Sequence, residues 1–365
     1  MEANVEISSK PSLNGYVMTG GSGNQSYAKN SSYQRNVIDA TKLLIQKAVS
    51  EQLHPRNFLA LETFYVADLG CSVGPNTFIS VQNIIDAVKL KYQSTNDKIP
   101  EFQVLFNDHL LNDFNTLFKC LPLNREYYAS GVPGSFYSHL FPRASLHFVH
   151  TSYSLHWLSC VPKEVITSNK GRIHHLGAGE EVTKAYSRQH AVDFANFLQA
   201  RAREVVPGGL MVIVLPSRPD GVSHSLISLN IMFDILGSSL MDLAKKGIID
   251  EEKVDAFNIP IHVASPLELE ATIKQDGCFS IEKMESLPEV SAAYMYHMHH
   301  IPHFVSLTLR ATTQELISEH FGEEILDGLF EVFTNKLVEA HKDAKLGLRS
   351  NLFLLLKRKE EGIIN

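Results

Sequence analysis

The sequence predicts an α/β protein with a mostly parallel sheet, an antiparallel edge strand and a mainly helical cap. Short β-branched and aromatic runs alternate with helical patterns, which is typical of β-α-β units and a parallel sheet buried on both faces. This alternation stops after Pro219, and two later runs look like strands that return to one edge of the sheet as antiparallel partners. The expected strands are TFYVADLGC at 63–71, FQVLFND at 102–108, SLHFVHTSYSLHWL at 145–158, GGLMVIVLPS at 208–217, CFSIEKMESL at 278–287 and SNLFLLLKRK at 350–359.

Two helical patterns precede and connect the first strands. Residues 31–53 form an amphipathic pattern that begins at Ser and Asn residues, which favour helix N-termini. Residues 80–93 place four aliphatic side chains at helical spacing and fit a crossover helix between two parallel strands. We therefore expect three segments: an N-terminal segment and α/β core over 1–219, a helical cap over 220–322, and a return to the core sheet over 323–365.

Composition excludes several classes of protein. The chain has 365 residues and a formal net charge of −7, which gives no electrostatic footprint for nucleic acid or an acidic membrane. No apolar run reaches membrane-spanning length, and the first residues lack the pattern of a secretory signal. The four cysteines lie far apart and form no C-x-x-C pair, which argues against a zinc site and a disulfide framework. We expect a cytoplasmic protein without a nucleic-acid or membrane partner.

The stretch VADLGCSVGPNT, residues 66–77, places a carboxylate and two glycines at the end of the first predicted strand. Ligands of open parallel sheets bind at such strand ends, and glycine lets the backbone turn sharply beside them. The spacing D-x-G-x-x-x-G matches neither the dinucleotide fingerprint nor a P-loop. It suits a ligand with an amino group or sulfonium, such as S-adenosylmethionine, for which Asp68 would be an acceptor and Asp108, one strand along, would accept the ribose hydroxyls. A purely structural turn is the alternative.

Several ordered motifs resemble the plant SABATH methyltransferases. They are GNQSYAKNSSYQR at 23–35, DLGCSVGPNT at 68–77, NDHLLNDFNTLF at 107–118, VPGSFYSHLFP at 132–142, SYSLHWLS at 152–159, VPGGLMV at 206–212 and DAFNIP at 255–260. That family uses S-adenosylmethionine to methylate small carboxylic acids such as salicylate, benzoate, jasmonate or loganate, and one branch methylates xanthine nitrogens. The resemblance runs from about Met18 to Lys359 and implies a Rossmann-like class I methyltransferase core, a helical cap and a homodimer.

The resemblance also implies two sets of ligand contacts. A structural magnesium ion would take Asn169, Asp255, Asn258 and the backbone carbonyl of Phe257, an oxygen-only set that suits a hard cation. His109 stands where relatives often have leucine. The cofactor contacts would come from Tyr27, Ser31, Asp68, Gly70, Cys71, Asn76, Asp108, His109, Ser135 and Phe136.

Carboxyl methylation constrains the catalytic residues. A carboxylic acid is already ionised near neutral pH, so the protein must position it and exclude water rather than remove a proton. Neutral donors suit this better than Lys or Arg, because a cation would favour the charged ground state over the transition state. The resemblance implies that the Gln34 amide and the Trp157 indole N–H hold the substrate carboxylate, with Tyr153 nearby. A core aromatic is the alternative reading of Trp157.

Other residues are expected to shape the substrate pocket. His156 lies in a mostly apolar run, so we expect its neutral tautomer, either donating to the substrate or only packing. Salicylate-type members of the resembled family often carry methionine, tryptophan and tyrosine where this chain has His156, Phe233 and His262. The resemblance therefore favours a jasmonate, terpenoid or iridoid acid, or a broad benzoate-like range, over a cavity tight around one benzene ring. The alternatives are N-methylation of a xanthine-like heterocycle, which the presence of Gln34 disfavours, and ligand binding without turnover. By the resemblance, the pocket is lined by Met232, Phe233, His262, Leu309 and Thr312.

Overall fold

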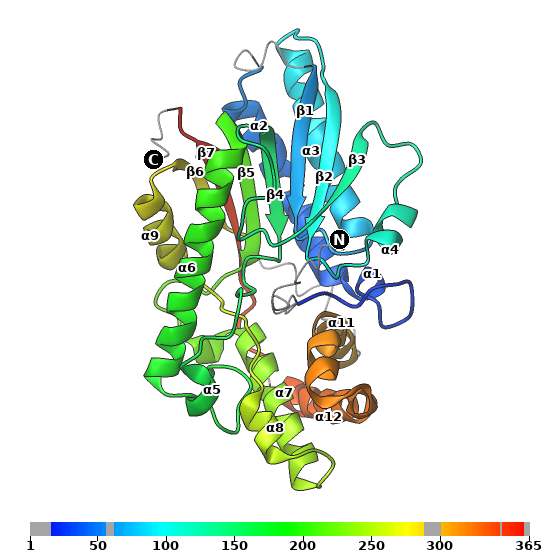
Figure 1. Cartoon of the computed structure of the whole chain (residues 1–365), viewed down its shortest axis with the longest axis vertical. Coiled ribbons are helices and arrows are strands. Elements are labelled where there is room, and N and C mark those ends of the chain that lie inside the picture. The colour runs from blue at the N-terminus through cyan, green and yellow to red at the C-terminus, as the bar shows by residue number, and fades with distance from the viewer. Residues whose placement is uncertain (1–15, 56–61, 288–300, 344, 361–365) are drawn as a thin grey trace, which may run out of the picture.

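The computed structural model describes residues 16–55, 62–287, 301–343 and 345–360. Within these residues one seven-stranded sheet has the order β3-β2-β1-β4-β5-β7-β6 (Figure 1). The first five strands pair in parallel, and β7 pairs antiparallel with β5 and β6. The predicted fold class and the antiparallel return at one edge are confirmed. The strands are β1 Thr63–Leu69, β2 Glu101–Asp108, β3 Tyr128–Pro133, β4 Leu146–Ser152, β5 Val205–Pro216, β6 Phe279–Ser286 and β7 Asn351–Arg358.

Helices cover both faces of the sheet because successive strand side chains point to opposite faces. Val66 and Phe148 pack into one apolar cluster with α2 and α3, whereas Ala67 and Val149 pack into another with α6 and α9. Both clusters are buried, so the strands read as continuous apolar runs. These helices span α2 Ser32–Gln52, α3 Pro75–Ser94, α6 Glu180–Glu204 and α9 Pro266–Asp276.

The cap is interleaved with the sheet in the sequence. Helices α7, α11 and α12 pack together around a third apolar cluster at one end of the sheet (Figure 1). Helix α9 and strand β6 come from the expected cap segment but pack on the core, while α12 comes from the expected return segment but packs in the cap. The cap helices are α7 Ser228–Lys245, α8 Glu251–Ala256, α11 Ile301–Phe321 and α12 Leu326–Lys342; the short elements are α1 Tyr27–Asn30, α4 Phe114–Lys119, α5 Val165–Ser168, η2 His224–Leu226 and η3 Glu323–Ile325.

No described helix is long and apolar enough to span a membrane.

Five histidines gather where α6 meets the segments that lead into the cap. Neighbouring ring centroids in this group, His174, His175, His190, His224 and His262, lie 4.0 to 5.8 Å apart. Burial lowers the pKa of His174 and His190 to about 3, and that of His224 to about 4. The rings of His174, His190 and His224 are therefore neutral near pH 7.

We expect His174, His190 and His224 to make the fold sensitive to acid. The unfolded histidines have a pKa of about 6.5, so below that pH the unfolded state binds more protons than the folded state. The free energy of unfolding should therefore fall as the pH drops from about 6.5 towards 4, by up to ~1.4 kcal/mol per pH unit for each buried histidine. Urea titrations at several pH values measure this slope. His190→Gln should make it shallower, whereas substitution of the half-exposed His139 should not; a stability that stays constant down to pH 5 would contradict the expectation.

Candidate active site

A cavity of about 270 Å³ opens where β1, β2 and β4 end. The parallel register aligns Leu69 of β1 with Asn107 of β2 and with Thr151 of β4, so the residues that follow these three strands meet at one edge of the sheet. Gly70, Asp108 and the segment from Ser152 to Ser154 are therefore brought to the same cavity wall. The arrangement is the one expected for a cofactor at the carboxyl ends of parallel strands.

The glycine turn is forced by close packing. Gly70 has a φ of +79°, and a Cβ there would lie 1.9 Å from the Ser154 hydroxyl oxygen. Gly74 has a φ of +112°, and a Cβ there would lie 2.8 Å from the Cβ of Ala28. Only glycine adopts both conformations without strain or a clash. The turn thus brings bare backbone to the cavity wall, as the sequence suggested.

The two carboxylates predicted for the cofactor differ in their surroundings. Asp108 lines the cavity and accepts hydrogen bonds from the backbone N–H of Ser72 at 2.6 Å and of His109 at 2.7 Å. Burial raises the pKa of Asp108 to about 6, although these hydrogen bonds oppose the rise. The carboxylate is still ionised near pH 7 and can accept further hydrogen bonds.

Asp68 is buried and does not belong to the residues that line the cavity. One of its carboxylate oxygens lies 2.7 Å from Nδ1 of His150, and the other accepts a hydrogen bond from the hydroxyl of Thr77. Its side chain points towards the start of α3, so both oxygens are already engaged by the protein. Asp68 therefore joins the end of β1 to β4 and to the first turn of α3, and its direct contact with the cofactor stays a prediction.

The other predicted cofactor residues divide into two groups. Tyr27, His109, Ser135 and Phe136 line the cavity. Ser31, Cys71 and Asn76 lie behind its wall, where the Asn76 amide donates to the carbonyl and hydroxyl oxygens of Ser31 at 3.0 and 2.9 Å. These contacts join the first turn of α3 to the start of α2.

A buried ion pair supports the loop that carries Ser135 and Phe136. The Arg201 guanidinium, fully buried on α6, donates to the backbone carbonyls of Phe136 at 2.8 Å and Ser138 at 2.9 Å. It also donates to the buried carboxylate of Glu204 at 2.7 Å, which in turn accepts from the backbone N–H of residues 140 and 141. Both charges are therefore paired and hydrogen-bonded, as burial requires.

A second cavity of about 140 Å³ lies between the core and the cap. Met18, Tyr27, Tyr153 and Trp157 line both cavities, so the two share a wall. The structure brings most of the predicted substrate residues together around this second cavity: Gln34, Tyr153, His156, Trp157, Met232, Phe233, Leu309 and Thr312.

The polar groups of this second cavity are largely uncharged. No described residue exchanges a hydrogen bond with the Gln34 amide, whose Oε1 is buried, or accepts one from the Trp157 indole N–H. Burial lowers the pKa of His156 to about 3, so its ring is neutral near pH 7, in agreement with the sequence expectation. Trp157 is partly buried at the shared wall and is not enclosed in the core.

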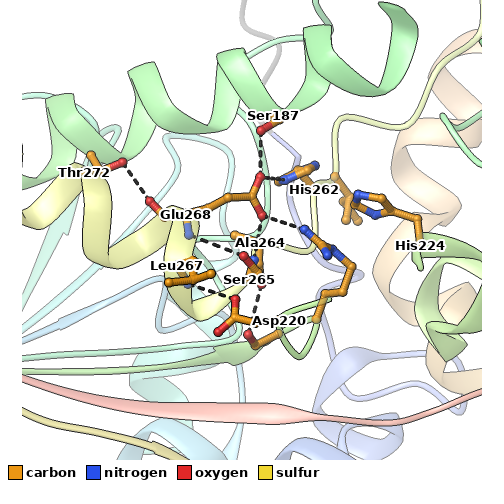
Figure 2. A network of polar contacts seen from close by, with 12 residues as sticks. Ser187, Asp220, His224, His262, Ala264, Ser265, Leu267, Glu268 and Thr272 are labelled. Carbon is orange, nitrogen blue, oxygen red and sulfur yellow. Dashed lines mark hydrogen bonds and ion pairs between the residues drawn. The ribbon is translucent and has the colours of Figure 1, made fainter. Parts of the chain in front are cut away.

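His262 is the exception among the predicted pocket residues. It is fully buried and points away from the cavity, while its neighbours Ile261 and Val263 line that cavity. Adjacent side chains of an extended segment point in opposite directions, so only the neighbours can face the pocket. Figure 2 shows His262 directed at Glu268, whose carboxylate lies 3.3 Å from the imidazole Nε2. The prediction of a pocket role for His262 is therefore wrong.

Several cavity residues were not found from the sequence. Strand β7 runs antiparallel, so its first residues lie at the edge where the parallel strands end. Asn351 there accepts from the Tyr153 hydroxyl and donates to the Tyr33 hydroxyl oxygen at 3.0 Å. The predicted antiparallel return could have identified this position. Other cavity residues that the sequence analysis did not identify lie on α2, α7 and α11 or just before β7: Tyr33, Ser228, Thr308 and Arg349.

The residues suggested for magnesium lie together beside α8. The Asn169 amide donates to Oδ1 of Asn258 at 2.8 Å, and Asp255 accepts from the backbone N–H of Gly171 at 2.6 Å. Oδ1 of Asn169 is buried and has no partner among the described residues, which fits an oxygen ligand set for a hard cation. Among the described residues, no group of three or more His, Cys, Asp or Glu side chains could hold a metal ion.

Comparison with known proteins agrees with this site. Residues 14–359 match a family described as SAM-dependent carboxyl methyltransferase. Loganic acid O-methyltransferase of Catharanthus roseus is 47% identical over 97% of this chain and 98% of its own length. Paraxanthine methyltransferase 2 of Arabidopsis thaliana is 40% identical over 89% of this chain and 92% of its own length.

A solved structure of a loganic acid methyltransferase with SAH is 48% identical, has a TM-score of 0.90, and is matched over 94% of this chain and 99% of the other. The cofactor of this family is S-adenosylmethionine, as the sequence analysis expected. The protein is an enzyme that uses S-adenosylmethionine for carboxyl O-methylation. The chain belongs to the family of S-adenosylmethionine-dependent carboxyl methyltransferases, the SABATH family that its motifs resemble.

Proposed function

We propose that Gln34 and Trp157 hold the carboxylate of a small acid while it is converted to its methyl ester. The observation that carries the proposal is a pair of neutral N–H groups, on an amide and an indole, that line the second cavity and have no acceptor among the residues that the structure describes. Trp157 also lines the cofactor cavity, so a carboxylate bound to it lies next to the methyl donor. A carboxylate, with two acceptor oxygens, satisfies both donors at once.

The chemistry explains why these donors are uncharged. When bound, S-adenosylmethionine supplies the methyl group and leaves as S-adenosylhomocysteine. A carboxylate oxygen forms the new O–CH₃ bond as the S–CH₃ bond breaks, so a negative and a positive charge both disappear. Gln34 and Trp157 orient the oxygen without stabilising its charge as strongly as a cation would, and the neutral His156 adds no positive charge. The apolar walls exclude water from the carboxylate.

The cavity walls favour an acid that is larger or more polar than benzoate. Met232, Phe233 and Leu309 supply apolar surface, and Thr312 and Arg349 add polar groups. A terpenoid, iridoid or jasmonate acid fits this mixture, and the loganic acid methyltransferases among the relatives support an iridoid-like acid. The second candidate is N-methylation of a xanthine-like heterocycle, which the paraxanthine methyltransferase relative keeps open. Gln34 favours the carboxylate, since a neutral heterocycle presents no anionic oxygen.

The proposal has three further parts. Asn169, Asp255, Asn258 and the carbonyl of Phe257 would hold a magnesium ion with a structural role in the cap. The family resemblance supports a homodimer. A cytoplasmic location and the lack of a nucleic-acid or membrane partner are consistent with the net charge of −7.

The first test removes the two donors separately. Gln34→Ala and Trp157→Phe should each lower kcat/KM for ester formation by about 10- to 100-fold, because each loses a hydrogen bond to a charged group worth ~1.5–3 kcal/mol. The assay detects methyl esters by mass spectrometry after incubation with loganic, benzoic, salicylic, jasmonic and farnesoic acids. Gln93→Ala, on the exposed side of α3, is the matched control and should retain full activity. Full ester formation by both site variants, or N-methylation of xanthines that survives Gln34→Ala, would count against the proposal.

The second test concerns Asp108 and pH. Its folded pKa of about 6 means that the carboxylate is lost below pH 6, so cofactor affinity should weaken as the pH falls. If binding requires the ionised form, the Kd for S-adenosylhomocysteine should rise about tenfold between pH 7.5 and pH 5. Titration calorimetry measures this change, and circular dichroism confirms that the protein stays folded at each pH. Asp108→Asn should bind more weakly and lose this pH dependence; an affinity that is constant over the range would rule out the role.

A further inference from the structure

The Tyr16 ring lies against the Trp157 indole. The ring centroids are 5.7 Å apart and the planes are inclined by 24°, which is a stacked geometry. Tyr16 also lines the cofactor cavity. A residue before the first predicted motif therefore contacts one of the two proposed carboxylate donors, and no sequence motif indicated this contact.

The segment that carries Tyr16 is anchored to both the core and the cap. The backbone N–H of Thr19 donates to the carbonyl of Ala311 on α11 at 2.9 Å. The N–H of Gly21 donates to the Asp113 carboxylate at 3.0 Å, and the N–H of Tyr27 donates to the Thr19 carbonyl at 2.9 Å. These hydrogen bonds fix the path of residues 19–21 and so hold the adjoining Tyr16 beside the shared wall of the cavities.

The backbone of Trp157 is held independently of its ring. Its N–H donates to the Ser154 carbonyl at 3.1 Å, its carbonyl accepts from the Tyr137 hydroxyl at 2.5 Å, and it forms a β-bridge with Ile261. These contacts leave the side-chain torsions free, so the direction of the indole N–H depends on what packs against the ring. The described aromatic neighbours of the indole are Tyr16 and His156, and of the two contacts only that with Tyr16 is stacked; the His156 ring lies 6.0 Å away at 49°.

We propose that Tyr16 is a positioning residue: its ring holds the plane of the Trp157 indole so that the N–H points at the substrate carboxylate. This inference rests on the proposed role of Trp157 as a carboxylate donor. Burial, with the nearby Cys160, Glu319 and Asp193, raises the pKa of the Tyr16 phenol above its usual value, so the side chain is uncharged at neutral pH. The aromatic face, and not the hydroxyl, carries the role.

Trp157 is the single tryptophan of the chain, so its fluorescence reports directly on the indole. With excitation selective for tryptophan, Tyr16→Ala should shift the emission to longer wavelength and increase quenching by acrylamide, with or without S-adenosylhomocysteine. Tyr16→Phe should keep the wild-type emission, because it retains the ring. Tyr128→Ala, at an exposed position of β3, is the control. Unchanged emission and quenching in Tyr16→Ala would overturn the proposal; if that variant does not fold, Tyr16→Leu, which keeps the apolar volume but lacks the aromatic face, takes its place.

Kinetics then separate the positioning role from the proposed function. With whichever acid of the panel is esterified, Tyr16→Ala should lower kcat about 3- to 10-fold, the size expected for one aromatic pair, and Tyr16→Phe should restore it. In a Trp157→Phe background, Tyr16→Ala should have little further effect, because the N–H that it orients is gone. An equal loss in both backgrounds would overturn the role of Tyr16 alone. A fully active Trp157→Phe variant would instead overturn the proposed role of Trp157 in binding the substrate carboxylate.

Discussion

The parallel pairing of β1 with both β2 and β4 is the constraint on which the site depends. It aligns the ends of three strands that are far apart in the sequence, so the glycine turn, Asp108 and the segment leading to Trp157 face one cavity. The antiparallel β7 adds its first residues to the same edge. The cavity at the strand ends and the cavity between core and cap share a wall that includes Tyr153 and Trp157, both from the segment that follows β4.

Burial controls the charges around this wall. It lowers the pKa of His156 and raises that of Asp108. Among the described residues no lysine lines either cavity, and Arg349, which lines the second one, has its guanidinium carbon 5.7 Å from the centroid of the Tyr33 ring. A reaction in which opposite charges vanish is slowed by any group that stabilises those charges in the ground state. Neutral donors and a neutral imidazole fit that requirement. The carboxylate of Asp108 lines the cavity at the strand ends. Its expected ligands are the ribose hydroxyls of the cofactor and not the reacting atoms.

Much of this arrangement could be predicted from the sequence, because apolar runs and glycine spacing are local signals. All strands except β3, the turn at Gly70 and the antiparallel return followed from them, and most of the site residues that motif resemblance indicated line the two cavities. The rest depends on long-range packing. His262 lies outside the regular strands, so the sequence does not show which side chains of its segment face the cavity. The structure shows that Ile261 and Val263 do, and that His262 points the other way. The pairing of Asp68 with His150 and the stacking of Tyr16 on Trp157 likewise join distant parts of the chain.

Strand β7 begins only at residue 351, yet it lies inside the sheet between β5 and β6. While the ribosome is still adding earlier residues, β5 has an unpaired edge and β6 has no strand beside it. Exposed apolar strand edges are sites of aggregation, so a nascent chain is vulnerable until residues 351–358 have emerged. The enzyme therefore cannot mature domain by domain during translation, and chaperone protection during its synthesis matters more than for folds whose central strands are made first.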